Sequence, residues 1–248
     1  MPACRVLVIV PCLNEADSLP TVLSDLKNAT RALAGEFQID VVVVDDGSED
    51  RSSQIAVDHG VVVLRHCANL GIGGAVQSGL RFALRNGYDF ATQVDGDGQH
   101  PPEQLKTLLQ AAQLSPGNDL VIGSRFVEHN GYQSTILRRM GSLWLGVILR
   151  VLTGLKVADP TSGFRVFGIR ALRLFAQHYP YDYPEPESLA IAKAARLKIA
   201  EVSVKMKQRQ GGSSSLGGLK GPYYMVKVSV AILLAVFRGV PQTGNVKE

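Results

Sequence analysis

The chain has 248 residues, of which 46% are apolar and 19% charged, and its formal net charge at pH 7 is +4. This length fits one large α/β domain better than two separate cores, and the apolar fraction excludes general disorder. The positive charge is too small to indicate nucleic-acid binding, and it fits an anionic small substrate or an anionic membrane surface equally well. Cys4, Cys12 and Cys67 follow no metal-ligand or disulfide spacing, which is typical of a reducing compartment.

The first half of the chain alternates short β-branched runs with helical patterns, which predicts a parallel sheet. Strands are expected at 5–10, 39–44, 61–64, 90–94 and 120–122, and helices at 18–33, 52–59, 74–86 and 102–114. Most of the strand runs are almost wholly apolar, as expected for strands that are covered on both faces. Gly60, Gly87 and Gly117 stand where helix-terminating residues are expected.

The second half predicts a long amphipathic helix over 134–153, further strands at 161–167 and 200–204, and a last helix from 222 to 238. A glycine- and serine-rich loop is expected at 210–218. Crossing a bilayer takes about 20 apolar residues, and neither helix provides such a run. The N-terminus does not resemble a signal peptide either, so we expect a cytoplasmic protein, with membrane contact left open.

Polar residues gather directly after three of the predicted strands. Segment 11–15 follows the first strand, 45–48 follows the second, and 95–99 follows the fourth. A single Asp-Gly pair is usually only a turn. In an open parallel sheet, however, ligands bind outside the carboxyl ends of the strands, so three acidic clusters at three strand ends predict one shared site.

Asp95, Asp97 and Gln99 alternate along the chain, and an extended segment would point these three side chains to the same side. Oxygen ligands of this kind are typical of Mg²⁺ or Mn²⁺, which keep several waters and bridge substrate phosphates. A calcium-binding loop is excluded, because its sixth position would be histidine and its twelfth lysine. His100 and Asp119 are expected to be surface residues.

Six motifs then occur in one order: Val-Pro-Cys-Leu-Asn-Glu at 10–15, Val-Asp-Asp-Gly-Ser at 44–48, Asn-Leu-Gly at 69–71, Asp-Gly-Asp-Gly-Gln-His-Pro-Pro-Glu at 95–103, Gly-Ser-Arg-Phe at 123–126 and Asp-Pro-Thr-Ser-Gly-Phe-Arg at 159–165. This order resembles family-2 glycosyltransferases, and more narrowly the dolichyl-phosphate mannose synthase and polyprenyl-phosphate sugar synthase branch. The resemblance implies a GT-A fold over residues 1–215, an α/β domain with a mostly parallel sheet and helices on both faces. Residues 216–248 would form a C-terminal loop and an amphipathic helix that contacts a membrane interface or another protomer.

The resemblance also implies a nucleoside-diphosphate sugar donor and a divalent cation, Mg²⁺ or Mn²⁺. The residues that would contact the donor are Pro11, Leu13, Glu15, Asp45, Asp46, Asp95, Arg209 and Ser214. Asp95 and Asp97 would face the diphosphate as catalytic residues, and the metal ligands would come from Asp95, Asp97 and Gln99. Asp45 either shares the base and ribose pocket or only caps its loop.

By the same resemblance, Arg125, Arg138, Arg139 and Ser162 would hold an acceptor phosphate, a task for which guanidinium groups are suited. Glu185 and Glu187 occupy the region where hydroxyl-using relatives keep a catalytic general base. A phosphate acceptor is already ionised and needs no base, so both chemistries stay open at this point.

The leading hypothesis is an inverting transfer of one sugar to a polyprenyl phosphate, by a peripheral protein at the inner face of the membrane. Transfer to a sugar hydroxyl of a lipid-linked or cell-surface glycan is the second. A third is a catalytically silent nucleotide-sugar-binding assembly subunit, which would not need Asp95, Asp97 and Gln99 together. A nucleotidyltransferase would need a glycine-rich, basic phosphate loop near the first strand, and the sequence has none there. Homodimerisation is the alternative use of the apolar helices.

Overall fold

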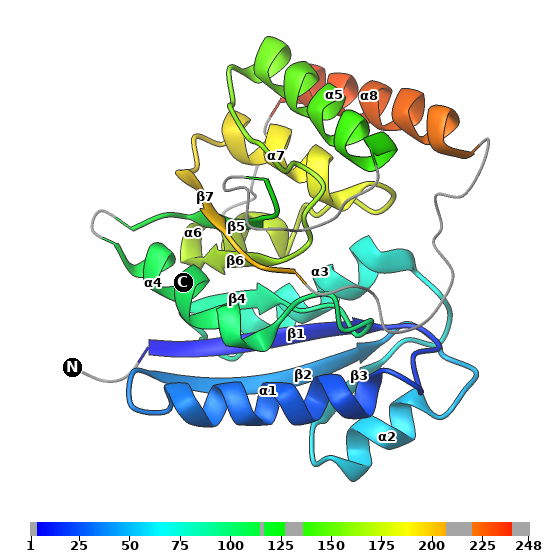
Figure 1. Ribbon diagram of the computed structural model, residues 1–248, viewed down its shortest axis with the longest axis vertical. Helices are drawn as coiled ribbons and strands as arrows, with labels where there is room; N and C mark the ends of the chain where they lie inside the picture. Colours follow the sequence, from blue (N-terminus) through cyan, green and yellow to red (C-terminus); the bar gives the residue numbers. More distant parts are fainter. Residues whose placement is uncertain (1–3, 115–116, 127–135, 207–219, 240–248) are drawn as a thin grey trace.

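The structure is a computed structural model that describes residues 4–114, 117–126, 136–206 and 220–239, with only the backbone described at 136–138 and 220–223. Within this range a seven-stranded sheet, in the order β3-β2-β1-β4-β6-β5-β7, lies between two layers of helices (Figure 1). The strands are β1 (Cys4–Cys12), β2 (Phe37–Asp45), β3 (Val62–Arg65), β4 (Phe90–Gln93), β5 (Leu120–Ser124), β6 (Arg165–Gly168) and β7 (Ile199–Ser203). The helices are α1 (Leu19–Leu33), α2 (Ser52–Asp58), α3 (Gly71–Arg85), α4 (Leu105–Gln113), α5 (Ile136–Thr153), α6 (Ile169–Phe175), α7 (Pro184–Ala194) and α8 (Lys220–Arg238), with a 3-10 turn at Pro102–Gln104.

The sheet is mostly parallel, as predicted. Strands β3, β2, β1 and β4 pair in parallel, as do β5 and β7, whereas β6 runs antiparallel to both β4 and β5. Because β6 is reversed, the segment that precedes it enters at the edge where β1, β2, β4 and β5 end, which we call the carboxyl edge. Residues 161–164, expected to open a strand, are instead part of a loop at this edge.

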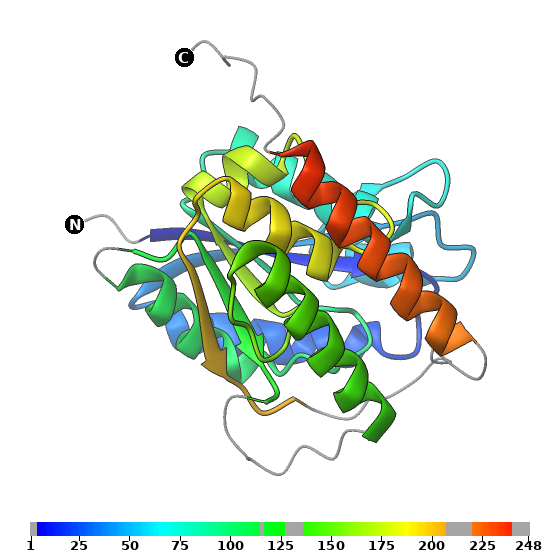
Figure 2. The ribbon, with the colours of Figure 1, turned by 90° about the horizontal axis from the view of Figure 1, so that it is seen from above.

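The two sides of β1 show how the sequence builds both layers. Val6 and Val8 face one core, which α1, α2 and α4 cover, and Leu7 and Ile9 face the other, which α3, α6 and α7 cover. Each fully buried aliphatic side chain of this kind stabilises the fold by about 1.5–3 kcal/mol. Helices α5 and α8 pack on α7 and on each other as an outer layer (Figure 2).

Six of the helices confirm the sequence predictions, and α6 and α7 were not predicted. Helix α6 has only 7 residues, and α7 begins with the sequence Pro-Glu-Pro-Glu, which reads as a loop. Proline is nevertheless compatible with the first helical turn, where backbone N–H groups have no partner within the helix. Gly60 and Gly87 end their helices with φ of +73° and +68°, as predicted, whereas Gly117 is not among the described residues with positive φ.

Helix α8 belongs to the same core as the sheet. Val228 and Ile232 are fully buried, and they join Leu145 and Leu149 of α5 in one apolar cluster. The predicted division at residue 215 falls between the described segments, and α8 packs onto the domain that precedes it. None of the helices in the described part of the chain is long and apolar enough to cross a membrane.

Candidate active site

The loops after β1 and β2 are held together by hydrogen bonds to their main chains. Asp46 N donates to Cys12 O at 2.9 Å, Asn14 N to Ser48 Oγ at 3.0 Å, and Glu15 N to Ser52 Oγ at 2.9 Å. Asn14 has a φ of +53°, a left-handed conformation that asparagine tolerates better than most residues. The first two predicted polar clusters therefore form one fixed surface.

Asp45 and Asp46 are both buried in this surface. Asp45 Oδ1 accepts a hydrogen bond from Ser48 N at 2.9 Å, so this residue caps its own loop, one of the two roles expected for it. Asp46 Oδ1 accepts from Leu70 N at 2.9 Å and lies 2.7 Å from His66 Nδ1, while Oδ2 accepts from Gly71 N at 2.8 Å. The observed contacts of Asp46 thus fix the start of α3 beside the predicted donor pocket.

The third polar cluster lies against the first. A Cβ atom at Gly96 would be only 2.0 Å from Glu15 Oε2, so this position has no room for a side chain. Ser18 Oγ also donates to Gly96 O at 2.7 Å. The three polar clusters predicted from separate strand ends therefore come together at the carboxyl edge, and their use as one ligand site stays a prediction.

Cys12 lies at the base of this site, at the end of β1. The residue is 3% exposed. Burial, reinforced by the negative charge of Glu15, raises the pKa of this thiol to about 12. It is therefore a neutral packing residue at physiological pH.

The segment after β4 differs from the extended arrangement expected for Asp95, Asp97 and Gln99. It turns at residues 96–97, and Gly98 has a φ of +77°. Asp97 Oδ1 accepts a hydrogen bond from Gln99 N at 3.0 Å, which closes the loop upon itself. Alternation along an extended strand is therefore the wrong description, because glycines at 96 and 98 let the chain turn.

His100 and Asp119 are not surface residues. His100 is 5% exposed and stacks on Phe164, with ring centroids 4.9 Å apart. Asp119 is 9% exposed, and its Oδ2 accepts hydrogen bonds from Lys198 N and Arg170 Nη1. Both expectations failed because the partners come from distant segments that local sequence does not identify.

Arg125 forms an ion pair with the loop that precedes β6. The Arg125 guanidinium is 3% exposed, and its Nε and Nη2 each lie 2.7 Å from an oxygen of the buried Asp159 carboxylate. Nη2 also donates to Thr161 Oγ1 at 2.9 Å. Glu201 of β7 in turn accepts hydrogen bonds from the main chain at Ala158 and Asp159. The Arg125 guanidinium is therefore engaged in a bidentate ion pair inside the fold, and its predicted contact with an acceptor phosphate stays a prediction.

Ser162 and Arg165 have similar internal roles. Ser162 is 1% exposed and donates through Oγ to Gly123 O, so it does not present a hydroxyl to an acceptor. The fully buried Arg165 donates to Ser162 O, Pro160 O and Ser188 Oγ, and burial lowers the pKa of its guanidinium. These contacts hold the loop before β6 against α7.

The two glutamates at the start of α7 have different surroundings. Burial raises the pKa of Glu185, the nearby Arg165 partly opposes this, and the charge of Asp95 adds to it. Burial also raises the pKa of Glu187, but its charged neighbours are Arg238 and Asp182. Of the two glutamates, only Glu185 has a predicted catalytic carboxylate, that of Asp95, among the charges that shift its pKa.

The remaining predicted residues are spread more widely. Pro11 is buried at the end of β1, Leu13 is 39% exposed beside it, and Arg139 is exposed on α5. Arg209 and Ser214 lie outside the described residues, as does the side chain of Arg138. Among the described residues, no three His, Cys, Asp or Glu side chains are grouped so as to hold a metal ion.

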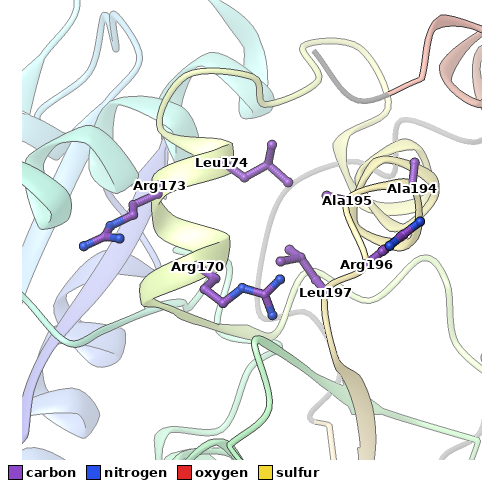
Figure 3. Close-up of a pocket in the computed structure, with 7 residues that line it drawn as sticks. All are labelled: Arg170, Arg173, Leu174, Ala194, Ala195, Arg196 and Leu197. Carbon is purple, nitrogen blue, oxygen red and sulfur yellow. The ribbon is translucent and has the colours of Figure 1, made fainter. Parts of the chain in front are cut away.

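A separate groove of about 390 Å³ lies between α6 and the end of α7 (Figure 3). It is lined by Arg170, Arg173, Leu174, Ala194, Ala195, Arg196 and Leu197. Helix α6 follows β6, whose antiparallel direction takes its end away from the carboxyl edge. This groove is therefore not part of the site formed by the acidic loops.

The family of the chain follows from comparison with known sequences. The family model described as glycosyl transferase family 2 matches residues 7–175, more than half of the chain. The chain belongs to glycosyl transferase family 2. The matched region runs from within β1 to the end of α6 and contains the three polar loops of the carboxyl edge.

Several curated proteins are similar to this member of the family. An undecaprenyl-phosphate mannosyltransferase of Micrococcus luteus is 38% identical over 175 residues, which cover 68% of each chain. A polyprenol monophosphomannose synthase of Mycolicibacterium smegmatis is 33% identical over 67% of this chain and 62% of its own length. A dolichol-phosphate mannosyltransferase of Pyrococcus furiosus is 32% identical over 64% of this chain and 45% of its own.

Solved structures confirm the expected GT-A fold. Glucosyl-3-phosphoglycerate synthase of Mycobacterium tuberculosis, in complex with Mn²⁺, UDP-glucose and phosphoglyceric acid, has a TM-score of 0.71 to this chain. The match covers 97% of this chain and 82% of that one, at 20% sequence identity. At this identity the likeness establishes the fold and says nothing of substrates.

Proposed function

We propose that the protein is an inverting, metal-dependent glycosyltransferase that moves a sugar from a nucleoside-diphosphate sugar to a polyprenyl phosphate. The observation that carries this proposal is the fixed carboxyl edge, where the loop after β4 packs through Gly96 against Glu15 and Ser18 of the loop after β1. The names of the relatives from Micrococcus luteus and Mycolicibacterium smegmatis, both sugar transferases to polyprenyl carriers, support the acceptor class.

The donor set at the edge fits a hard divalent cation. Mg²⁺ and Mn²⁺ are usually held by one or two carboxylates together with substrate phosphates, so a cage of three protein ligands is not required. Asp95 and Asp97 provide carboxylates on one short loop, and the Asp95 side chain is 32% exposed. We assign the metal to these two residues with Gln99. When bound, a cation of this kind neutralises the charge that grows on the leaving diphosphate.

The protein's own residues then position the reacting groups. Asp46 and Asp45 hold the loops that flank the donor pocket, and the Arg125–Asp159 pair holds the loop before β6. An acceptor oxygen attacks the anomeric carbon while the bond to the diphosphate breaks, which inverts the configuration. Such fixed polar groups cost little reorganisation during reaction, and this is a main source of transition-state stabilisation.

The outer helices support a membrane-bound acceptor. Ten large apolar side chains on α5 and α8 are exposed; they form what we call the α5–α8 surface and are Met140, Leu143, Trp144, Val147, Val151, Val226, Val230, Leu233, Leu234 and Phe237. Neither helix contains an acidic residue, whereas both contain Arg or Lys. Amphipathic helices of this composition bind the interface of anionic membranes.

The two outer helices also begin on the side of the molecule toward which β1 points (Figure 1). The α5–α8 surface therefore starts on the same side of the molecule as the carboxyl edge, the side on which a lipid-linked phosphate would meet the donor. We propose that this surface docks the protein peripherally on the inner face of the membrane. A homodimer through the same surface is the alternative that the vesicle experiment described in the Discussion distinguishes.

A second candidate function is transfer to a sugar hydroxyl of a glycan. Glu185 favours it, because burial raises the pKa of this carboxyl group and the charge of Asp95 adds to the effect. A raised pKa suits a group that must accept a proton near neutral pH. The lipid-phosphate proposal does not need this base.

The test is a transfer assay with labelled UDP- and GDP-sugars. Each donor is offered undecaprenyl phosphate in vesicles or a soluble glycan, with Mn²⁺ or with EDTA. We expect label to enter the lipid fraction only with metal. Label in the glycan alone would show that the acceptor is a sugar hydroxyl and not a lipid phosphate. Absence of both transfer and donor hydrolysis would refute the enzymatic function.

A further inference from the structure

The imidazole of His100 contacts Asp95 in two places. Its Nδ1 accepts a hydrogen bond from Asp95 N at 3.0 Å. Its Nε2 lies 3.6 Å from Asp95 Oδ2, too far for a normal hydrogen bond but close enough for electrostatic attraction. One buried ring thus faces both the main chain and the carboxylate of the same residue.

The first contact determines where the ring proton lies. A backbone N–H can only donate, so Nδ1 of His100 must carry the lone pair, and in the neutral ring the proton is on Nε2. The N–H bond of His100 is then on the nitrogen nearest Asp95 Oδ2. The other oxygen, Oδ1, accepts a hydrogen bond from Gln93 Nε2 at 2.8 Å. Both oxygens of Asp95 are therefore approached by a polar hydrogen from inside the protein.

The surrounding atoms keep the ring in this orientation. Phe164 is fully buried, and its ring is within 11° of parallel to that of His100. A Cβ atom at Gly163 would lie 2.9 Å from Gln93 Nε2 and 3.5 Å from both Asp95 Oδ2 and His100 Cε1. The loop before β6 thus closes over the group without room for a side chain at 163.

We propose that His100 is a positioning residue that, together with Gln93, fixes the orientation of the Asp95 carboxylate toward the donor diphosphate and its cation. The proposal rests on the proposed function, which assigns Asp95 to the diphosphate. Groups that orient a metal-binding carboxylate in this way typically change metal affinity or activity by about 10–100-fold when they are removed.

The first test needs neither metal nor substrate. The ¹⁵N chemical shifts of the His100 ring, assigned by comparison with His100→Asn, report which nitrogen carries the proton. We expect the Nε2–H form, and an Nδ1–H form would overturn the proposal. Failure of the proposed function would leave this result unchanged, so the two can be told apart.

The second test separates positioning from packing. His100→Phe keeps a ring against Phe164 and removes both nitrogens, whereas His100→Asn keeps an acceptor for Asp95 N. Binding of Mn²⁺ in the presence of UDP or GDP is measured by electron paramagnetic resonance, with exposed His59→Phe as the matched control. We expect His100→Phe to weaken Mn²⁺ binding about 10–100-fold, and His100→Asn to retain part of the affinity.

A double-mutant cycle with Asp95→Asn completes the design. If His100 acts through Asp95, His100→Phe should add little to the loss caused by Asp95→Asn, because interacting residues are not additive. Fully additive losses, or wild-type Mn²⁺ binding by a folded His100→Phe protein, would overturn the proposal. If His100→Phe does not fold, the same double-mutant cycle with His100→Asn and Asp95→Asn tests the proposal.

Discussion

The carboxyl edge and the α5–α8 surface differ in which side chains they bury and which they expose. At the edge, charged side chains such as Asp46 and Arg125 are buried and bound to neighbouring loops. On the outer helices, apolar side chains such as Val151 and Phe237 are 76% and 79% exposed. Buried charges need partners inside the protein, whereas a group of exposed apolar side chains marks a surface that binds something else. This difference supports the proposal that the edge binds the water-soluble donor and that the helices contact the lipid.

The largest expected effect is a loss of turnover, without a loss of vesicle binding, when a carboxylate of the carboxyl edge is replaced. Asp97→Asn should lower turnover by about 10²-fold or more, because it removes charge that stabilises the cation and the leaving diphosphate. Vesicle binding should not change, and Asp58→Asn, on α2, serves as the control. Full activity of the Asp97 variant, or of the wild type in EDTA, would contradict the metal-dependent mechanism.

A smaller effect is expected on the outer helices. Val147→Glu introduces a negative charge on the α5–α8 surface, and flotation should show roughly tenfold weaker binding to anionic vesicles. Val57→Glu is a matched control, since Val57 is 55% exposed and Val147 is 57% exposed. Wild-type binding should also weaken as salt rises. If the protein does not bind anionic vesicles at low salt but dimerises through Val147, the α5–α8 surface is instead a contact with a second copy of the chain.

The smallest expected effect on activity distinguishes a phosphate acceptor from a hydroxyl acceptor. Glu185→Gln should leave transfer to polyprenyl phosphate within a few-fold of wild type, since an ionised acceptor needs no base. Transfer that collapses in this variant but persists in Glu187→Gln would instead support a hydroxyl acceptor.

The same variant has a predicted effect on stability. Because the folded-state pKa of Glu185 is raised, the folded protein binds more protons than the unfolded chain at pH values just above the usual glutamate pKa. Stability should therefore fall as pH rises through that interval. Glu185→Gln removes this loss, so its Tm relative to wild type should increase from pH 4 to pH 7. A constant difference in Tm across this range would show that Glu185 titrates normally.

The sequence by itself determined the regular parts of the protein. The sequence predicted a strand near each of the seven strands that the structure describes, most clearly for the apolar runs, because a strand covered on both faces is apolar along its length. The strand expected at 161–167 was placed too early, since β6 begins at Arg165. The acidic residues at three strand ends predicted that their loops would meet, because parallel strands bring their carboxyl ends to one edge, and the structure brings these loops together. Six ordered motifs indicated the family, which the comparisons confirmed.

Only the tertiary structure decided which polar residues are available to a ligand. Arg125 and Ser162 match family motifs, yet inside the fold Arg125 pairs with Asp159 and Ser162 donates a hydrogen bond to Gly123 O. His100 looked like a surface residue and is buried beside Asp95. Hydrogen-bond partners that lie 34 to 39 residues away for Arg125 and Ser162, like the stacking of His100 on Phe164, depend on how strands and loops meet in space. Local sequence carries the periodicity of an element, but it does not carry the identity of a distant partner.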